Sequence, residues 1–304
     1  MDDDDGELQA AIAASLEDSN KARQVEEAPS ATTLATMTAQ EQDRLTVEQM
    51  NEIVAGIASS QPMVGDRLKL GEALLPEYAD NPSKGFARGI GVLEGKYSAM
   101  RRVRKDGNCF YRAFLYRYVE QLCVDHAAGP GSKVLEAPEG SELERVQKVI
   151  KSSKEKLLSV GYEDSAIDMF WDMLVEVLDE VPKTTADSWH SKMNDEHGVS
   201  MHIVWFCRAL SATQIKLQPE RFEPFIMDDT GVADVHAFCR TEVEPVNMEC
   251  EQVQIIALTE MLGVPVCIEY LDGSGAPTCI VFPEGSKPCV TLLYRPGHYD
   301  ILYE

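Results

Sequence analysis

Along most of the chain, apolar residues recur at spacings of three and four, which is typical of helices that bury one face. From about residue 62, short helices are expected first, and this spacing then predicts helices over about 109–122, 141–160, 165–181, 219–225, 232–241 and 251–262. After residue 263, short runs rich in aliphatic and aromatic residues predict strands over 264–270, 278–282, 290–294 and 299–303. Helices followed by a cluster of strands indicate an α+β fold.

Residues 1–60 have a different character. They contain 13 acidic and 3 basic residues and no aromatic residue, so they have little to bury, and we expect short helices separated by disorder. One helix would follow the four aspartates at 2–5 and another would span about 39–59, with a linker over 19–38. The first helix places four residues on one stripe: Leu8, Ala11, Ile12 and Ser15. The pattern leaves open whether the first helix has any special role, and whether the second packs on its own domain.

The stretch Lys105-Asp106-Gly107-Asn108-Cys109 predicts a tight loop that delivers a cysteine to the first turn of a helix. Asp106 and Asn108 are turn and cap formers, and Phe110, Ala113 and Phe114 begin the apolar face of that helix. The positive end of a helix dipole favours a thiolate, and unpaired amides of such a loop are able to hold an oxyanion. Cys109 is thus a candidate nucleophile, although a cysteine beside an apolar face is commonly a small buried hydrophobe.

A histidine and a carboxylate stand close together near the C-terminus. Two apolar runs flank Arg295-Pro296-Gly297, which predicts strand, turn and strand. His298 and Asp300 lie two residues apart on the second strand and therefore point to the same face. A histidine oriented by a carboxylate and paired in space with a distant cysteine is the arrangement of nucleophilic catalysis. The alternative for His298 is an ordinary turn histidine.

Both segments resemble a known family. DGNCFYRAF at 106–114 and YRPGHYDILY at 294–303 are similar to the cysteine and histidine boxes of the otubains, which are deubiquitinating cysteine proteases of the ovarian-tumour type. The resemblance runs from about residue 42 to 304 and includes LLPEYADNP at 74–82 and FPEGSKP at 282–288. It implies a papain-like fold with helices packed on a C-terminal mixed β-sheet. The expected parts are a ubiquitin-interacting-motif-like helix at 1–20, an acidic linker and helical arm at 21–60, and a catalytic domain at 61–304.

The resemblance also implies roles for individual residues. Cys109 corresponds to the nucleophile, His298 to the general base and Asp300 to the residue that orients it. Asp106 corresponds to the aspartate beside the oxyanion loop, in which Gly107 and Asn108 lie. The stripe at residues 8–15 resembles a ubiquitin-interacting motif. Residues 39–59 resemble the arm of longer otubains that contacts a second ubiquitin, and residues 162–170 correspond to a surface that contacts ubiquitin-conjugating enzymes.

The function expected from this resemblance is an isopeptidase that separates the C-terminal glycine of ubiquitin from lysine, with a preference for proteasome-targeting chains. The alternative is a ubiquitin-binding inhibitor of ubiquitin-conjugating enzymes that works without cleavage. Expected partners are ubiquitin, polyubiquitin chains and ubiquitin-conjugating enzymes, and the chain is expected to be a monomer. The spacing of the remaining histidines forms no metal-ligand motif, so neither a metal nor a cofactor is expected.

The composition of the chain argues against several other classes of function. The net charge of −23 argues against binding to nucleic acid or anionic membranes, and no apolar run has the length of a membrane span. The first residues do not resemble a signal peptide. The eight cysteines include no Cys-x-x-Cys pair, which disfavours a disulfide framework and a structural zinc site. We therefore expect a reducing compartment, cytoplasmic or nuclear.

Overall fold

The computed structural model of the chain describes Gly56 and residues 61–129, 135, 140–195, 198–227 and 233–304. The first helix expected near the N-terminus lies outside these residues, as does the second except for Gly56. Among the described residues, no helix is long and apolar enough to cross a membrane.

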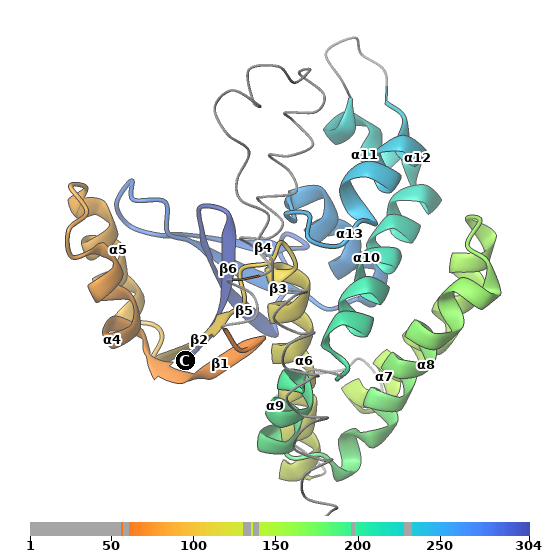
Figure 1. The fold of residues 1–304 in the computed structure, drawn as a ribbon, viewed down its shortest axis with the longest axis horizontal. Coiled ribbons are helices and arrows are strands. Elements are labelled where there is room, and N and C mark those ends of the chain that lie inside the picture. The colour runs from red at the N-terminus through yellow and green to blue at the C-terminus, as the bar shows by residue number, and fades with distance from the viewer. Residues whose placement is uncertain (1–55, 57–60, 130–134, 136–139, 196–197, 228–232) are drawn as a thin grey trace, which may run out of the picture. The chain divides into compact units, whose positions relative to one another are not determined.

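The described part of the chain is built around a mixed sheet of six strands in the order β1-β2-β6-β5-β3-β4 (Figure 1). Only β3 and β5 run parallel; the other neighbours are antiparallel. Its strands are β1 (Val64–Lys69), β2 (Ala99–Val103), β3 (Val266–Tyr270), β4 (Thr278–Phe282), β5 (Val290–Arg295) and β6 (His298–Tyr303). The predicted α+β class and the mixed sheet are confirmed.

The two N-terminal strands contradict the expectation that only short helices precede the cysteine loop. β1 reads VGDRLK and β2 reads AMRRV, so neither has the alternation of a half-buried strand. β1 is mostly exposed at the edge of the sheet, and β2 owes its place to pairing with β6, where Met100 lies opposite Leu302. Pairing with distant segments of the chain therefore overrides the local sequence.

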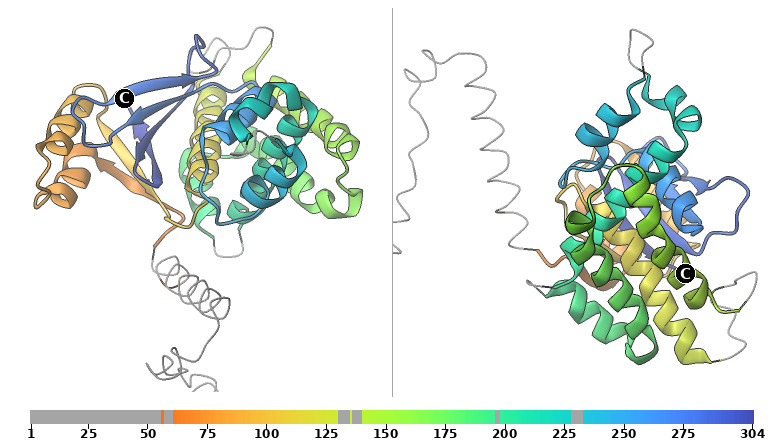
Figure 2. Two further views of the ribbon diagram at one scale, coloured as in Figure 1. Left: turned by 90° about the horizontal axis from the view of Figure 1, so that it is seen from above. Right: turned by 90° about the vertical axis from the view of Figure 1, so that its right-hand side faces the viewer.

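Helices cover both faces of the sheet (Figures 1 and 2). One face is covered by α4 (Leu70–Leu74), the 3-10 turn η1 (Leu75–Tyr78) and α5 (Lys84–Glu94), whose Leu74 and Ile90 pack with Leu293 and Leu302. The other face carries α6 (Cys109–Ala128), and around it lie the remaining helices. These are α7 (Glu142–Ser159), α8 (Asp164–Glu180), η2 (Val181–Lys183), α9 (Ala186–Asn194), α10 (Ser200–Leu217), α11 (Pro219–Ile226), α12 (Val235–Phe238), the π-helical turn η3 (Cys239–Val243) and α13 (Gln252–Leu262).

Several predicted helix boundaries are confirmed. Ser141 caps α7, because its hydroxyl accepts from the Glu144 amide while the Glu144 carboxylate accepts from the Ser141 amide. α8 ends at Glu180, and Pro182 lies in the turn that follows it. The single helix predicted over 232–241 is instead α12 followed by η3.

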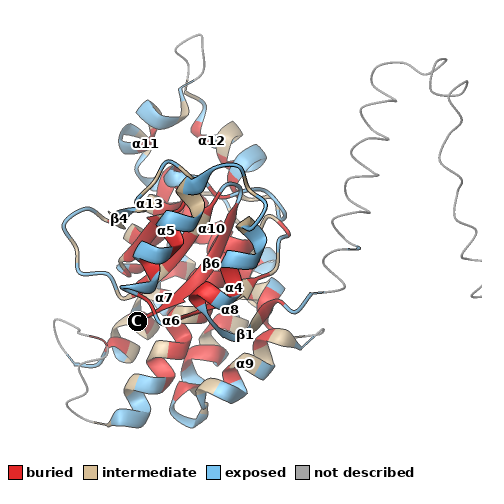
Figure 3. Cartoon of the chain, turned by 90° about the vertical axis from the view of Figure 1, so that its left-hand side faces the viewer, coloured by how far each residue is buried: buried red, intermediate tan, exposed pale blue. Residues whose placement is uncertain are grey.

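Thirteen of the 20 residues of α6 are buried, and the central strands beside it are red, that is buried, in Figure 3. Phe110 and Phe114 are fully buried, and the Phe110 ring packs edge-on against Tyr299 of β6 at 5.4 Å. This contact sets the start of α6 against the start of β6. The two sequence boxes, distant in the chain, therefore meet in the fold.

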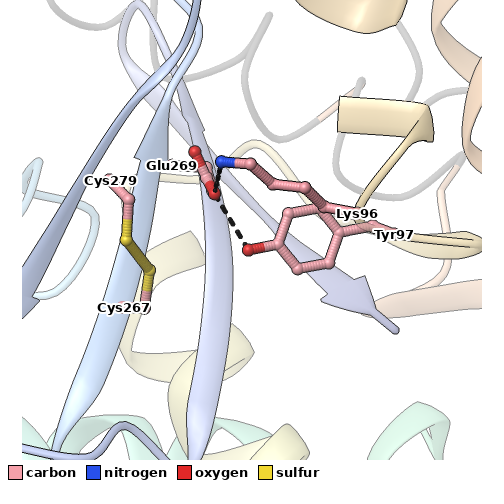
Figure 4. The surroundings of a disulfide bond; sticks show 5 residues. All are labelled: Lys96, Tyr97, Cys267, Glu269 and Cys279. Carbon is pink, nitrogen blue, oxygen red and sulfur yellow. Dashed lines mark hydrogen bonds and ion pairs between the residues drawn. A yellow bond between two sulfur atoms is a disulfide. The ribbon is translucent and has the colours of Figure 1, made fainter. Parts of the chain in front are cut away.

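A disulfide joins Cys267 of β3 to Cys279 of β4 (Figure 4). The sequence disfavoured a disulfide framework, so this disulfide differs from the expectation. The two cysteines are brought together by the β3–β4 register, in which Cys279 lies opposite Glu269, two residues after Cys267. The sequence alone gave no sign of this contact, because it depends on how the two strands pair.

Candidate active site

Cys109 is the first residue of α6, and Gly107 shapes the loop before it. Gly107 has φ +73°, and a Cβ atom added to it would lie 2.1 Å from the backbone oxygen of Asn247. Only glycine fits this position, because the left-handed backbone and the facing loop both exclude a side chain. The loop before the predicted nucleophile is therefore held tightly against residues 244–250.

Asp106 faces the interior of this loop. Both of its carboxylate oxygens accept from Arg112, at 2.8 Å from Nη1 to Oδ1 and 2.7 Å from Nη2 to Oδ2. Arg112 is fully buried, and its Nε donates to the hydroxyl of Ser200. Asp106 also accepts from the Asn108 amide at 3.0 Å. A bidentate buried pair of this kind fixes the loop to α6 and α10.

One of the loop amides expected to bind an oxyanion is already hydrogen-bonded to a described residue, and two are not. The Asn108 amide already donates to Asp106, so it is not free for substrate. Within the described residues, the amides of Gly107 and Cys109 have no acceptor. The Asn108 side chain does not cap α6 either, because its Oδ1 accepts from Arg208 and from the Asn247 amide. Of the expected oxyanion amides, those of Gly107 and Cys109 therefore remain as candidate donors.

His298 and Asp300 form the hydrogen-bonded pair that the strand register predicted. Nε2 of His298 lies 2.9 Å from Oδ1 of Asp300, and both residues are buried. The carboxylate acts as acceptor, so Nε2 carries the hydrogen and the lone pair resides on Nδ1. Nδ1 has no hydrogen-bond partner among the described residues. It is the atom of the ring that is available to take a proton from a thiol.

Asp300 is held by more than the histidine. Its Oδ1 accepts from the Val103 amide at 3.0 Å, and its Oδ2 accepts from Arg295 Nη2 at 2.6 Å. Burial raises the pKa of Asp300, but the hydrogen bond from His298, the charges of His298 and Arg295 and the Val103 amide outweigh it and lower the pKa to about 2. Asp300 is therefore ionised at neutral pH.

The structure adds residues that the sequence did not single out. Arg295 Nη1 donates to Glu77 Oε2 at 2.5 Å, and Glu77 also pairs with Arg102. A line of alternating charges thus leads from His298 through Asp300, Arg295 and Glu77. The only sequence signal for it was that Glu77 and Arg295 lie within segments that resemble the family.

Cys109 and His298 open onto different cavities in this conformation. Cys109 lines a cavity of about 420 Å³ with Glu249, Glu251 and Tyr270 among its walls, whereas His298 lines another of about 350 Å³. No hydrogen bond joins the Cys109 thiol to His298 within the described part of the chain. The two candidate catalytic side chains are therefore not hydrogen-bonded to each other in this structure.

The Cys109 thiol is protonated in this conformation. Burial raises the pKa of the thiol, and the carboxylates of Asp300 and Asp106 raise it further. A hydrogen bond from the Tyr299 backbone lowers it, and the pKa is about 11. The sequence favoured a thiolate through the helix dipole, whereas in this structure burial raises the pKa of the thiol. Because Cys109 is only 7% exposed, the cost of desolvating a thiolate exceeds the stabilisation that the helix dipole at the start of α6 provides.

Comparison with known proteins identifies the family, since the model for peptidase C65 otubains matches residues 57–304. The chain belongs to the otubain family. Human ubiquitin thioesterase OTUB1 is 34% identical over 264 residues, which cover 86% of this chain and 90% of the relative. An ovarian-tumour-domain deubiquitinating enzyme 1 from Arabidopsis thaliana is 33% identical over 268 residues, covering 81% of this chain and 82% of the relative.

Solved structures agree. A complex described as h/ceOTUB1 with ubiquitin aldehyde and UBCH5B~Ub superimposes with a TM-score of 0.74 and 29% identity, covering 87% of this chain and 99% of that one. The papain-like fold of this otubain is confirmed, and the chain is a thiol protease of the deubiquitinase class. The residues predicted to bind ubiquitin near the N-terminus, Leu8, Ala11, Ile12 and Ser15, lie outside the described residues.

Proposed function

We propose that this otubain hydrolyses the isopeptide bond between the C-terminal glycine of ubiquitin and a lysine. The observation that carries the proposal is the hydrogen-bonded pair of His298 and the ionised Asp300 on β6, packed beside Cys109 at the start of α6. The similarity to ubiquitin thioesterases over 86% of the chain supports ubiquitin as the substrate.

In the proposed reaction, Nδ1 of His298 takes the proton of Cys109, and the thiolate attacks the carbonyl of the ubiquitin glycine. The amides of Gly107 and Cys109 stabilise the oxyanion that forms. His298 then gives its proton to the leaving lysine amine, and water, activated by the same imidazole, releases the thioester. Asp300 keeps the imidazole in the tautomer that exposes Nδ1.

The finer features belong to the same proposal. We infer a preference for proteasome-targeting chains, which would require residues 39–59 to place a second ubiquitin. Leu8, Ala11, Ile12 and Ser15 would bind ubiquitin in addition. The protein would act as a monomer in the cytoplasm or nucleus. A panel of chains of defined linkage, cleaved by the full chain, tests the preference, and equal rates for all linkages would refute it.

The test of catalysis is the reaction of the full chain with a ubiquitin whose C-terminus carries a thiol-reactive electrophile. We expect one adduct per chain at Cys109, lost in Cys109→Ala and retained in the control Cys289→Ala, which removes another free cysteine. Lysine-linked ubiquitin should be cleaved by the same variants that form the adduct. A folded wild-type protein that binds ubiquitin without forming an adduct would refute the proposal.

A second candidate is inhibition of ubiquitin-conjugating enzymes without cleavage. The observation that favours it is the similarity to OTUB1 in complexes with ubiquitin-loaded UBCH5B and UBC13. Both activities are compatible with one chain. Deletion of residues 1–60 separates them: chain cleavage should weaken but persist, whereas inhibition measured with Cys109→Ala should disappear.

A further inference from the structure

One face of the β3–β4 hairpin carries two cysteines and a carboxylate that the proposed hydrolysis does not use. Glu269 lies opposite Cys279 in the antiparallel register, and Cys267 precedes Glu269 by two residues. Opposite residues, and residues two apart in one strand, point to the same face of a sheet. One ligand atom from each of the three lies within 4.8 Å of the others (Figure 4).

The carboxylate of Glu269 has one oxygen without a hydrogen-bond partner among the described residues. The residue is 1% exposed, and its Oε1 accepts both from Lys96 Nζ at 2.8 Å and from the Tyr97 hydroxyl at 2.9 Å. Its Oε2 has no hydrogen-bond partner among the described residues. A buried carboxylate oxygen without a partner is costly, so its presence calls for an explanation.

We propose that Cys267, Cys279 and Glu269 form a binding site for a divalent cation of the zinc type once the disulfide is reduced. Two thiolates and a carboxylate oxygen are ligands that zinc accepts in tetrahedral sites. Cys279 is exposed, so the ion has a path from solvent and a water molecule can take the fourth position. Zinc with two thiolates and one carboxylate carries a charge of −1, which the Lys96 ammonium balances.

Metal binding and the disulfide exclude each other at this site. A phosphine reductant gives an electron pair to the disulfide; the S–S bond breaks, phosphorus takes an oxygen from water, and both sulfurs leave as thiols. Zinc then displaces one proton from each thiol, so each ion bound releases two protons. The oxidised pair offers no thiolate and should not bind the ion.

The decisive experiment uses the full chain and zinc alone. Phosphine-reduced protein and oxidised protein are each equilibrated with zinc and desalted, the bound metal is measured by atomic absorption, and the thiols protected from a maleimide are identified by peptide mass. We expect one zinc per reduced chain, protection of both Cys267 and Cys279, and no zinc in the oxidised chain. Protection of other cysteines instead, or no zinc in a chain shown to be reduced, would overturn the proposal.

Matched variants assign the ligands. Glu269→Gln, which keeps the shape of the side chain, should weaken zinc binding at least tenfold, and Cys279→Ser should abolish it. Cys289→Ser, a partly exposed free cysteine elsewhere, should change nothing. Unchanged zinc binding in Cys279→Ser would also overturn the proposal. The result is independent of the proposed hydrolysis, because none of the three residues lines the cavity at Cys109.

Discussion

Replacing Arg295 by methionine tests whether the charged groups behind His298 hold the candidate catalytic pair in place. Arg295 is 4% exposed and donates to both Asp300 and Glu77. Methionine keeps much of the apolar volume but leaves two carboxylates without their shared cation. The imidazole would then be hydrogen-bonded to a carboxylate that is less firmly oriented.

The size of the effect follows from the pKa of Asp300. Its lowering from 3.8 to about 2 favours the ionised carboxylate by about 2 kcal/mol despite complete burial. Breaking a buried pair from one side costs about 3–5 kcal/mol, because it leaves an uncompensated charge. We therefore expect Arg295→Met to lower the free energy of unfolding at pH 7 by about 2–5 kcal/mol and the rate of adduct formation at least tenfold.

The pH dependence has a definite sign. Because the folded-state pKa of Asp300 is depressed, its stabilisation is complete above the unfolded value of 3.8 and is lost as the pH falls through about 2. The difference between wild type and Arg295→Met should therefore be largest near neutral pH and shrink in acid.

Urea denaturation and the electrophilic ubiquitin probe measure the two effects. Arg221→Met, which breaks the partly exposed pair with Glu260, is the control and should cost less than about 1 kcal/mol. Arg295→Lys should recover part of the stability by keeping one charge. A loss below 1 kcal/mol together with a wild-type reaction rate would refute the reasoning.

Three further outcomes are expected. Gly107→Ala should slow adduct formation and destabilise the fold by about 1–3 kcal/mol in thermal unfolding, because the φ of Gly107 is +73° and the facing loop leaves no space for a side chain. The control Gly91→Ala in α5 should change neither the rate nor the stability. Equal behaviour of the two variants would contradict this account of the loop. Asp300→Asn should lower kcat more than it raises KM, because Asp300 orients the base. Its effect on kcat should be smaller than that of His298→Ala, and equal losses of kcat in the two variants would contradict that role. The rate at which a small reagent alkylates Cys109, measured by mass spectrometry, should rise with pH between 7 and 10 without a plateau, since the pKa of Cys109 is about 11. A plateau near pH 7 would contradict a protonated thiol.

The sequence predicted the local parts of this site well. The turn around Gly107, the start of α6 and the shared face of His298 and Asp300 each depend on neighbouring residues, and the structure places all of them as expected. The caps of α7 and the end of α8 are also local and were predicted.

What the sequence could not supply depends on pairing between distant segments. β2 has little strand character of its own and forms because β6 lies beside it. Glu77 reaches Arg295 only after η1 has packed near β5, and Cys267 meets Cys279 only in the β3–β4 register. The raised pKa of Cys109 has the same origin, since it reflects burial by the whole fold rather than the dipole of one helix.

Hydrogen bonds hold both sides of the candidate site in place. Asp300 is fixed by Arg295 and the Val103 amide, so the strand that carries the base is held in place. The loop before Cys109 is held by the Asp106–Arg112 pair and is also joined to residues 244–250 through hydrogen bonds between Asn108 and Asn247. Glu249 of that segment lines the cavity next to Cys109. In the proposed reaction, a ubiquitin tail in this cavity would contact the segment to which that loop is joined, so its binding energy is available to bring the Cys109 thiol and the His298 imidazole together.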